Sequence, residues 1–303
     1  MSDAETLDSL FREAVSAVDA GDVTMLERLL AAHPRLVRDR LAAPGSWLRD
    51  KVGGALDGFF QQPYLLWFVA EDPVRNNKLS GNIAQVTRTI IQAAQREGVD
   101  SLPEQLDYAL RLVAWSGVAQ KCDVQIELID VLIDAGASPD GVPDNALVNG
   151  NVAAAERLVE RGAKLTLPTA ACLGRWDDIT RLAQAASATV KQMALVLAAL
   201  NGKSDALARL IPVGVDLDAP STELYSHATA LHHAVGSGSL DAATVLVEAG
   251  AALDTRDTIY DGTPLDWAEH YRHEHAHDAQ GERYAEIAVY LRGRLTRSVG
   301  SQA

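Results

Sequence analysis

One short pattern recurs along this chain of 303 residues, and it constrains the fold more than any other feature. In each copy, apolar residues at helical spacing lead to a glycine, the residue that most readily ends a helix with a positive φ. The clearest copies are VLVEAGAALD at 245–254, VLIDAGASPD at 131–140, RLVERGAKLT at 157–166 and RLIPVGVDLD at 209–218. Their glycines are 26, 52 and 36 residues apart, and the middle step is two copies long. A period of this length predicts one supersecondary unit per copy.

A second glycine turn precedes each of these helices. It reads AGD at 20–22, NGN at 149–151, LGR at 173–175, NGK at 201–203 and SGS at 237–239. Each copy is therefore a predicted αα-hairpin, and such a unit buries its apolar stripe only against its neighbours. We predict an all-α solenoid of about eight helix pairs, forming a single domain over residues 1–303. The predicted pairs are 6–20/23–32, 64–72/82–95, 103–116/124–135, 144–149/152–161, 168–173/176–186, 189–200/204–211, 229–236/240–249 and 263–276/282–292.

Two hexapeptides near the C-terminus carry a family resemblance. TALHHA at 229–234 and TPLDWA at 263–268 resemble the T-P-L-H-x-A signature of ankyrin repeats. The resemblance covers residues 105–292 closely and 6–94 more loosely, and segments 150–156 and 225–229 are also similar to a bacterial ankyrin-repeat group with no assigned activity. It implies that His232 bridges neighbouring repeats by hydrogen bonds and that a protein partner binds the concave face. Repeats between 141 and 203 are too short for projecting β-hairpin fingers, so we expect few fingers, mainly at 219–228 and 255–262.

The predicted domain has four parts: an N-terminal cap pair at 6–43, an irregular aromatic insertion at 44–62, repeats at 63–292 and a frayed tail at 293–303. Six aromatic residues lie within 47–68, namely Trp47, Phe59, Phe60, Tyr64, Trp67 and Phe68. They are interpreted either as a packed cap over the first repeats or as a partly exposed binding pocket, because large apolar side chains dominate binding hot spots. The sequence leaves both interpretations open.

Composition and charge narrow the class of partner. The chain has 41 acidic against 27 basic residues and a net charge of −14, which argues against nucleic acid, because phosphate contacts need a positive face. Its longest apolar run is the eight residues 193–200, far below the ~20 of a membrane-spanning helix. From the acidic N-terminus we expect no secretory signal, and we expect no disulfide framework from Cys122 and Cys172. We expect a cytoplasmic protein whose partner carries a basic patch.

No set of residues at recognisable spacing forms a catalytic nucleophile and base or a phosphate loop, so we predict no enzyme and no cofactor. The histidines at 270, 273, 275 and 277 are the strongest chemical signal. His270, His273 and His277 would share one face of a continuous helix and could hold a divalent ion. We predict a solvated helix end and no native metal site there. The alternative function is a small-ligand or metal site, with or without catalysis, at the insertion or at these histidines.

The predicted function is a non-enzymatic scaffold that binds a protein partner. Residues in the variable positions of the repeat are the candidate contacts, because packing does not require them and Tyr and His suit an adaptable binding surface. They are Tyr225, Ser226 and Tyr260 in the fingers, and Asn149, Asn201, Ser237, His270 and Tyr271 at the ends of the first helices. In register, they would form one stripe. A related possibility is a toxin-neutralising protein that sequesters a basic effector on its acidic surface.

Overall fold

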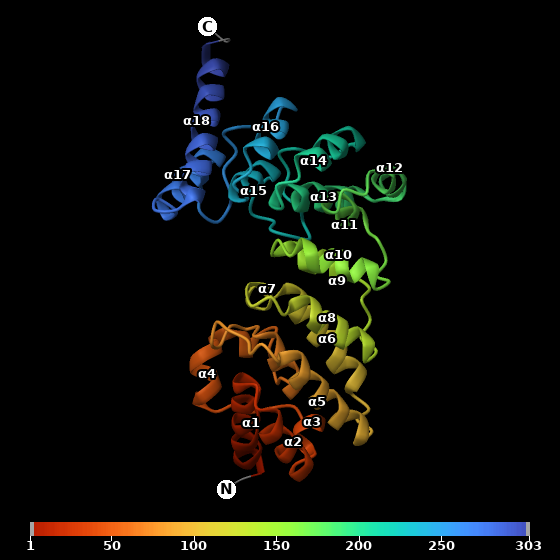
Figure 1. The fold of residues 1–303 in the computed structure, drawn as a ribbon. Coiled ribbons are helices and arrows are strands. Elements are labelled where there is room, and N and C mark those ends of the chain that lie inside the picture. The colour runs from red at the N-terminus through yellow and green to blue at the C-terminus, as the bar shows by residue number, and fades with distance from the viewer. Residues whose placement is uncertain (1–2, 301–303) are drawn as a thin grey trace. The chain divides into compact units, whose positions relative to one another are not determined.

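The computed structural model describes the backbone of residues 3–300 and the side chains of residues 6–296. The chain divides into two compact units, residues 1–164 and 165–303, and each is described by itself. About 65% of the chain is helical, and the described residues contain no strand (Figure 1). The all-α class predicted from the repeats is therefore confirmed. The single domain over residues 1–303 stays a prediction.

The first unit begins with a helix pair joined by a glycine turn. Gly21 has a φ of +68°, and the Asp22 side chain then caps the second helix by accepting a hydrogen bond from the Met25 N–H at 2.9 Å. The elements of this unit are α1 (Asp3–Ala20), α2 (Val23–Ala32), α3 (Arg35–Arg38), α4 (Ser46–Val52), η1 (Gly53–Asp57), η2 (Leu65–Ala70), α5 (Ile83–Arg96), α6 (Leu102–Trp115), α7 (Gly117–Lys121), α8 (Gln125–Asp134), α9 (Val142–Val148) and α10 (Val152–Glu160).

Four segments of the first unit differ from the prediction: the short helices α3 and α7, which were not predicted, the insertion and residues 64–72. The insertion at 44–62 is not wholly irregular, because it contains α4 and η1. Within residues 64–72, predicted as an α-helix, the structure has the short 3₁₀-helix η2 over 65–70. It ends at Glu71, which has a φ of +51° and forms a buried ion pair with Arg75 at 2.8 Å. Pro73 also disfavours helical geometry at the residue before it.

The second unit follows the predicted pairs closely. Its α-helices start and end within three residues of the predicted positions, except at the end of the chain. The elements are α11 (Leu167–Cys172), α12 (Trp176–Ala185), α13 (Ala188–Leu200), α14 (Ser204–Leu210), η3 (Ile211–Val213), α15 (Ala230–Gly236), α16 (Leu240–Glu248), α17 (Pro264–Glu274) and α18 (Ala279–Gly300).

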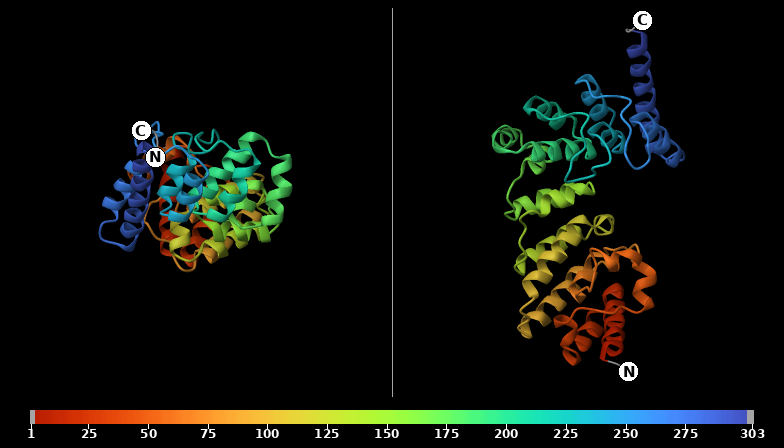
Figure 2. Two further views of the ribbon diagram at one scale, coloured as in Figure 1. Left: turned by 90° about the horizontal axis from the view of Figure 1, so that it is seen from above. Right: turned by 180° about the vertical axis from the view of Figure 1, so that it is seen from behind.

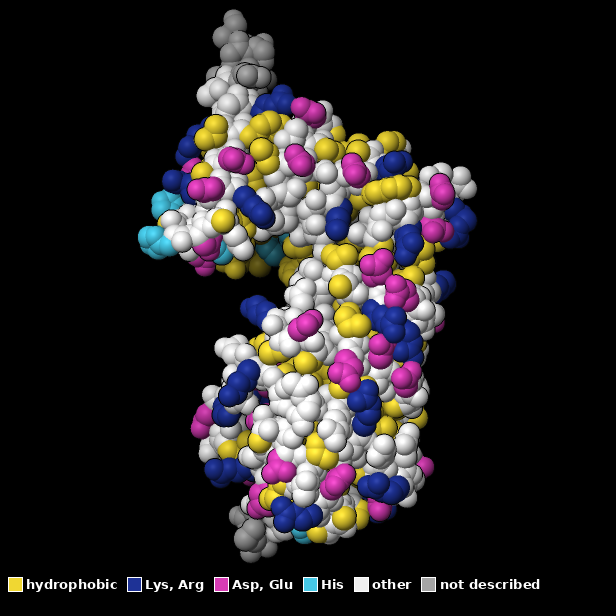
Figure 3. Space-filling model, in the orientation of Figure 1, with side chains coloured by type: hydrophobic (Ala, Val, Ile, Leu, Met, Phe, Trp, Pro, Cys, Tyr) yellow, Lys and Arg dark blue, Asp and Glu magenta, His cyan; other side chains and the backbone are white. Residues whose placement is uncertain are grey.

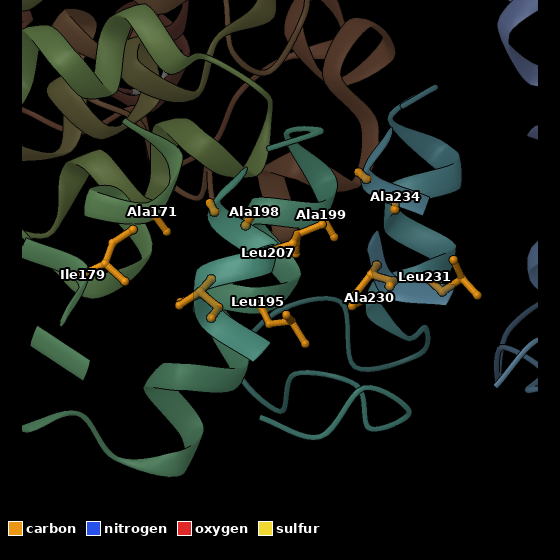
Figure 4. Packing of buried hydrophobic residues seen from close by; sticks show 14 of the residues in the cluster. Ala171, Ile179, Leu195, Ala198, Ala199, Leu207, Ala230, Leu231 and Ala234 are labelled. Atoms are coloured by element: carbon orange, nitrogen blue, oxygen red, sulfur yellow. The ribbon is translucent and has the colours of Figure 1, made fainter. Parts of the chain in front are cut away.

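Successive pairs of the second unit stack through a shared core. The first helices α11, α13, α15 and α17 contact one another in order, as the ribbon views show (Figures 1 and 2). Alanines on these helices let the backbones approach, while Leu195, Leu207 and Leu231 fill the space between them (Figure 4). Leu246 of the recurring pattern is fully buried in the same cluster. The repeated apolar positions are therefore the inter-repeat core.

The finger loops and the C-terminal helix complete this unit. Residues 219–228 and 255–262 form loops without strands, joined by the Thr258 N–H, which donates to the His227 carbonyl at 2.9 Å. Helix α18 continues to Gly300, although we expected a frayed tail from residue 293. Contacts of Arg294 with the Tyr290 ring and with Glu248, at 3.0 Å, support the extension. Residues 301–303 of the predicted tail lie outside the described residues.

Candidate protein-binding surface

One buried carboxylate orders the loop between α16 and α17. Asp257 is 2% exposed. Its Oδ1 accepts hydrogen bonds from the N–H groups of Ile259 at 2.9 Å and Tyr260 at 2.7 Å. Its Oδ2 accepts from the Gly262 N–H at 3.0 Å and from the Trp267 indole N–H at 2.9 Å. Burial alone would raise the pKa of Asp257, but the hydrogen bonds outweigh it and lower the pKa to about 2.

Helix α17 starts beside this loop with a capping box. The Thr263 hydroxyl oxygen accepts from the Asp266 N–H at 3.2 Å. In return, Asp266 Oδ2 accepts from the Thr263 N–H at 2.9 Å and from its hydroxyl at 2.8 Å. The Thr263 N–H and hydroxyl lower the pKa of the Asp266 carboxyl, which is therefore charged at neutral pH. The cap thus leaves a negative charge at the start of the helix.

A cavity of about 360 Å³ opens between the loop and α17. Its lining consists of Tyr260, Gly262, Asp266, Trp267, His270 and Tyr271. Three of the predicted contact residues therefore converge on one place. Tyr260 is 74% exposed, so it is no packing cap, whereas Tyr271 is half-buried and stacks on the Tyr284 ring at 5.2 Å.

Tyr225 lies in the preceding finger loop and does not line this cavity. It has a φ of +51°, and its ring packs 5.4 Å from the His233 ring and 6.1 Å from the His227 ring. The His227 ring in turn stacks on Trp267 at 6.1 Å. The His227 and His233 rings therefore lie between Tyr225 and Trp267 of the cavity lining.

The two histidines of the TALHHA hexapeptide have different environments. His232 Nδ1 contacts the Thr229 hydroxyl at 2.8 Å, and its Nε2 contacts the Gly262 carbonyl at 3.0 Å, so the predicted bridge between repeats is confirmed. His233 is 3% exposed, and its Nε2 has no hydrogen-bond partner among the described residues. Burial, followed by the neighbouring imidazoles of His227 and His232, lowers the pKa of His233 to about 4.

The other predicted contact residues lie apart from the cavity lining. Ser226 is exposed beside Tyr225. Three others donate to helix-end carbonyls: Ser237 Oγ to Ala234 at 2.7 Å, Asn201 Nδ2 to Leu197 at 2.9 Å, and Asn149 Nδ2, in the first unit, to Trp115 at 2.8 Å. Their role in partner binding stays a prediction.

The histidine cluster does not have the geometry that a continuous helix would give it. Helix α17 ends at Glu274, so His277 lies beyond the helix and does not share a helical face with His273. His275 Nδ1 instead contacts the Asp278 carboxylate at 2.9 Å. Among the described residues, no group of three or more His, Cys, Asp or Glu side chains is arranged to hold a metal ion. Histidine side chains gather on the surface at the end of α17 (Figure 3).

Most of the aromatic residues within 47–68 of the first unit are packed inside. Phe60, Tyr64, Trp67 and Phe68 are buried, whereas Phe59 is exposed. Phe59 lines a cavity of about 670 Å³, together with Arg40, Trp67, Tyr108 and Arg111 among others. Burial of four of the six aromatic residues favours the cap interpretation for those four. A small-ligand site at the insertion stays an untested alternative.

Three residues that build the surface are absent from the predicted contacts: Asp257, Asp266 and Trp267. Asp257 could have been predicted from the sequence, because an aspartate a few residues before a glycine often accepts backbone N–H groups in a turn. Trp267 and Asp266 stand inside the TPLDWA signature, whose positions are otherwise explained by packing and capping. The hydrogen bond between Trp267 and Asp257 spans ten residues and has no local sequence signal.

A comparison with known protein families agrees with the repeat pattern. A family model described as ankyrin repeats (3 copies) matches residues 146–257 and 195–277. Solved structures also match, among them the crystal structure of the human ASB11 ankyrin repeat domain. It is 19% identical and covers 67% of this chain and 94% of that one, with a TM-score of 0.32. No curated protein matches the chain significantly.

Among the described residues, no helix is long and apolar enough to cross a membrane. The family match includes both signature hexapeptides, and residues 146–277 of the chain are therefore similar to ankyrin repeats.

Proposed function

We propose that this chain is a non-enzymatic scaffold that binds a protein partner through the second unit. The contact surface is the aromatic finger surface, which comprises Tyr225, Ser226, Ile259, Tyr260, Asp266, Trp267, His270 and Tyr271. Ankyrin repeats are generally protein–protein interaction modules. The observation that carries the proposal is the convergence of Tyr260, His270 and Tyr271 on one cavity. As in the sequence prediction, the concave face of the repeats is the proposed binding side.

The chemistry of this surface supports protein binding. Tyr260 is 74% exposed and Ile259 is 62% exposed, so two large apolar side chains project from one loop. Tyrosine and tryptophan are enriched among the residues that contribute most to interface affinity. Little conformational entropy is lost on binding when the loop that carries such residues is already ordered, and Asp257 orders this loop.

The charge of the chain supports a basic partner. A net charge of −14 favours association with a positive surface and disfavours nucleic acid. Neither of the described cysteines, Cys122 and Cys172, forms a disulfide bond, which fits a reducing compartment such as the cytoplasm. The proposal requires no cofactor.

The test is affinity capture from native extract with four forms of the full chain: the parent, Tyr225→Ala, Tyr260→Ala and Val289→Ala. Val289 is an exposed apolar residue on α18, outside the aromatic finger surface, and serves as the matched control. A partner captured by the parent should bind Tyr225→Ala and Tyr260→Ala at least about fivefold more weakly, because hot-spot truncations cost more than ~1 kcal/mol. Val289→Ala should bind like the parent. Equal binding by all four forms would refute the proposed surface. Loss of binding by a fifth form, Phe59→Ala, would assign the site to the first unit.

A further inference from the structure

The cavity at the aromatic finger surface has the composition of a site for a cation. We propose that it receives an arginine side chain of the protein partner, an inference that rests on the proposed function. Four rings line the cavity, and one carboxylate, Asp266, lies with them. The face of an aromatic ring attracts a cation, and tryptophan does so most strongly.

The central ring of this cavity is held in place before any ligand arrives. The Trp267 indole N–H donates to Asp257 at 2.9 Å. The indole also packs edge-on against two other rings. Its centroid lies 5.1 Å from that of His232 and 6.2 Å from that of Tyr271. A ring fixed in this way loses little freedom when a side chain stacks on it, so the cation contact retains more of its free energy.

Charge around the cavity is predominantly negative. Asp266 lines it, and Asp261 and Glu274 are exposed nearby on the loop and on α17. Arg256 is the neighbouring cation, and it already pairs with Asp261 at 3.6 Å. Asp266 Oδ2 accepts the two capping hydrogen bonds and Arg256 also acts on this carboxylate electrostatically, but Oδ1 takes no part in the cap and faces a positive ligand.

The chain's own arginines show how its exposed rings are covered elsewhere. The Arg209 guanidinium lies 4.8 Å from the centre of the half-exposed Trp176 ring, and that of Arg294 lies 5.2 Å from the Tyr290 ring. Within the described side chains, no arginine or lysine stacks on Tyr260, Trp267 or Tyr271.

Size and geometry favour arginine. At about 360 Å³ the cavity is at the small end of ligand sites, which span about 300–1,000 Å³, so it suits a single side chain. A planar guanidinium can stack on an indole while one of its N–H groups donates to Asp266 Oδ1, whereas an ammonium is a compact point charge that does not stack.

The test uses the full chain with ¹⁵N-labelled tryptophan and two peptides. The probe is acetyl-Gly-Arg-Gly-amide, and the control peptide replaces arginine with citrulline, which keeps the shape and removes the charge. We expect the Trp267 indole N–H resonance, assigned with Trp267→Phe, to shift saturably with the arginine peptide at about millimolar Kd. The citrulline peptide should bind about tenfold more weakly.

Variants separate the cation site from its surroundings. Tyr260→Ala and Asp266→Asn should each weaken the arginine peptide about fivefold, and asparagine still accepts the capping hydrogen bonds at residue 266. Val289→Ala is the control, because Val289 is exposed on α18, outside the aromatic finger surface, and does not line the cavity. It should leave the affinity unchanged.

The outcomes distinguish this inference from the proposed function. Equal shifts with both peptides, or no shift with the arginine peptide, overturn the cation site. If partner capture still depends on Tyr260 in that case, the surface binds its partner by other contacts and the proposed function stands. If capture is indifferent to both Tyr225 and Tyr260 while the arginine peptide shifts Trp267, the cavity binds the cation but the proposed function fails.

Discussion

Replacing Asp257 by asparagine should destabilise the second unit and disorganise the aromatic finger surface. The substitution keeps the size of the side chain and removes its charge. Each carboxylate oxygen accepts two hydrogen bonds, Oδ1 from Ile259 and Tyr260 and Oδ2 from Gly262 and Trp267. An amide offers one oxygen, so two of the four donors would face an NH₂ group.

The size of the effect follows from these contacts. A hydrogen bond to a charged group contributes about 1.5–3 kcal/mol, and a buried donor left unsatisfied costs about 1–3 kcal/mol. Two lost acceptor contacts would therefore cost about 3–6 kcal/mol in a closed interior. The loop itself borders solvent, and freed N–H groups can reach water, so we expect Asp257→Asn to lower the unfolding free energy by about 2–4 kcal/mol.

Urea unfolding at pH 7, followed by circular dichroism, measures this change. Coupling between stacked repeats transmits a loop defect to neighbouring helices, so the helical signal reports it. The matched control is Asp261→Asn, because Asp261 is a strongly exposed carboxylate of the same loop. It should change stability by less than about 0.5 kcal/mol. If Asp257→Asn unfolds at the same urea concentration as the parent and the Trp267 indole N–H resonance does not move, Asp257 does not order the loop.

The remaining predictions concern the core and the histidine pair. Leu246→Ala should cost about 2–5 kcal/mol, since Leu246 is fully buried between repeats, and Val289→Ala should change stability by less than about 0.5 kcal/mol. A mutant of Leu246 that melts like the parent would mean that the repeats are misaligned. The lowered pKa of His233, about 4 against 6.5 for the unfolded chain, contributes stability that is complete above pH 6.5 and is lost as the pH falls through 4. At pH 5 this loss should be about 2 kcal/mol and should be absent from the pH dependence of His233→Gln; identical pH profiles would contradict it. Tyr225→Ala uncovers the His233 ring and should raise its pKa toward 6.5 in an NMR titration, whereas an unchanged pKa would show that other groups bury the ring.

The helix pairs of the second unit could be predicted because their signals are local. Gly174, Gly202 and Gly238 each have a positive φ of 62–69° at the turn inside a pair, where glycine carries no steric penalty. Apolar spacing and the two signature hexapeptides then set the direction of each helix. Such features depend on a few neighbouring residues.

The segments that differed from prediction depend on distant contacts. The 3₁₀-helix at 65–70 ends beside a buried ion pair between Glu71 and Arg75, and Arg75 also contacts Asp19 of α1 at 3.2 Å. The extension of α18 is supported by the ion pair of Arg294 with Glu248, which is 46 residues away in the chain. Helical periodicity carries no information about such partners.

The candidate site was partly predictable for the same reason. Tyr260, His270 and Tyr271 converge because the finger loop and the helix that follows it belong to one repeat. Tyr225 comes from the preceding finger, and its ring turns onto His233 instead of the cavity. The orientation of Trp267 depends on its contacts with Asp257 and the histidines, a three-dimensional arrangement that the hexapeptide does not encode by itself.

Hydrogen–deuterium exchange of the full chain, alone and with its captured partner, tests the aromatic finger surface most directly. The proposal predicts that the partner slows amide exchange in residues 224–228 and 255–271 of the second unit. Exchange in α12 and in residues 40–67 of the first unit should remain unchanged. Slower exchange confined to residues 40–67 and 104–111, around Phe59 and Tyr108, would contradict the proposal and assign partner binding to the insertion.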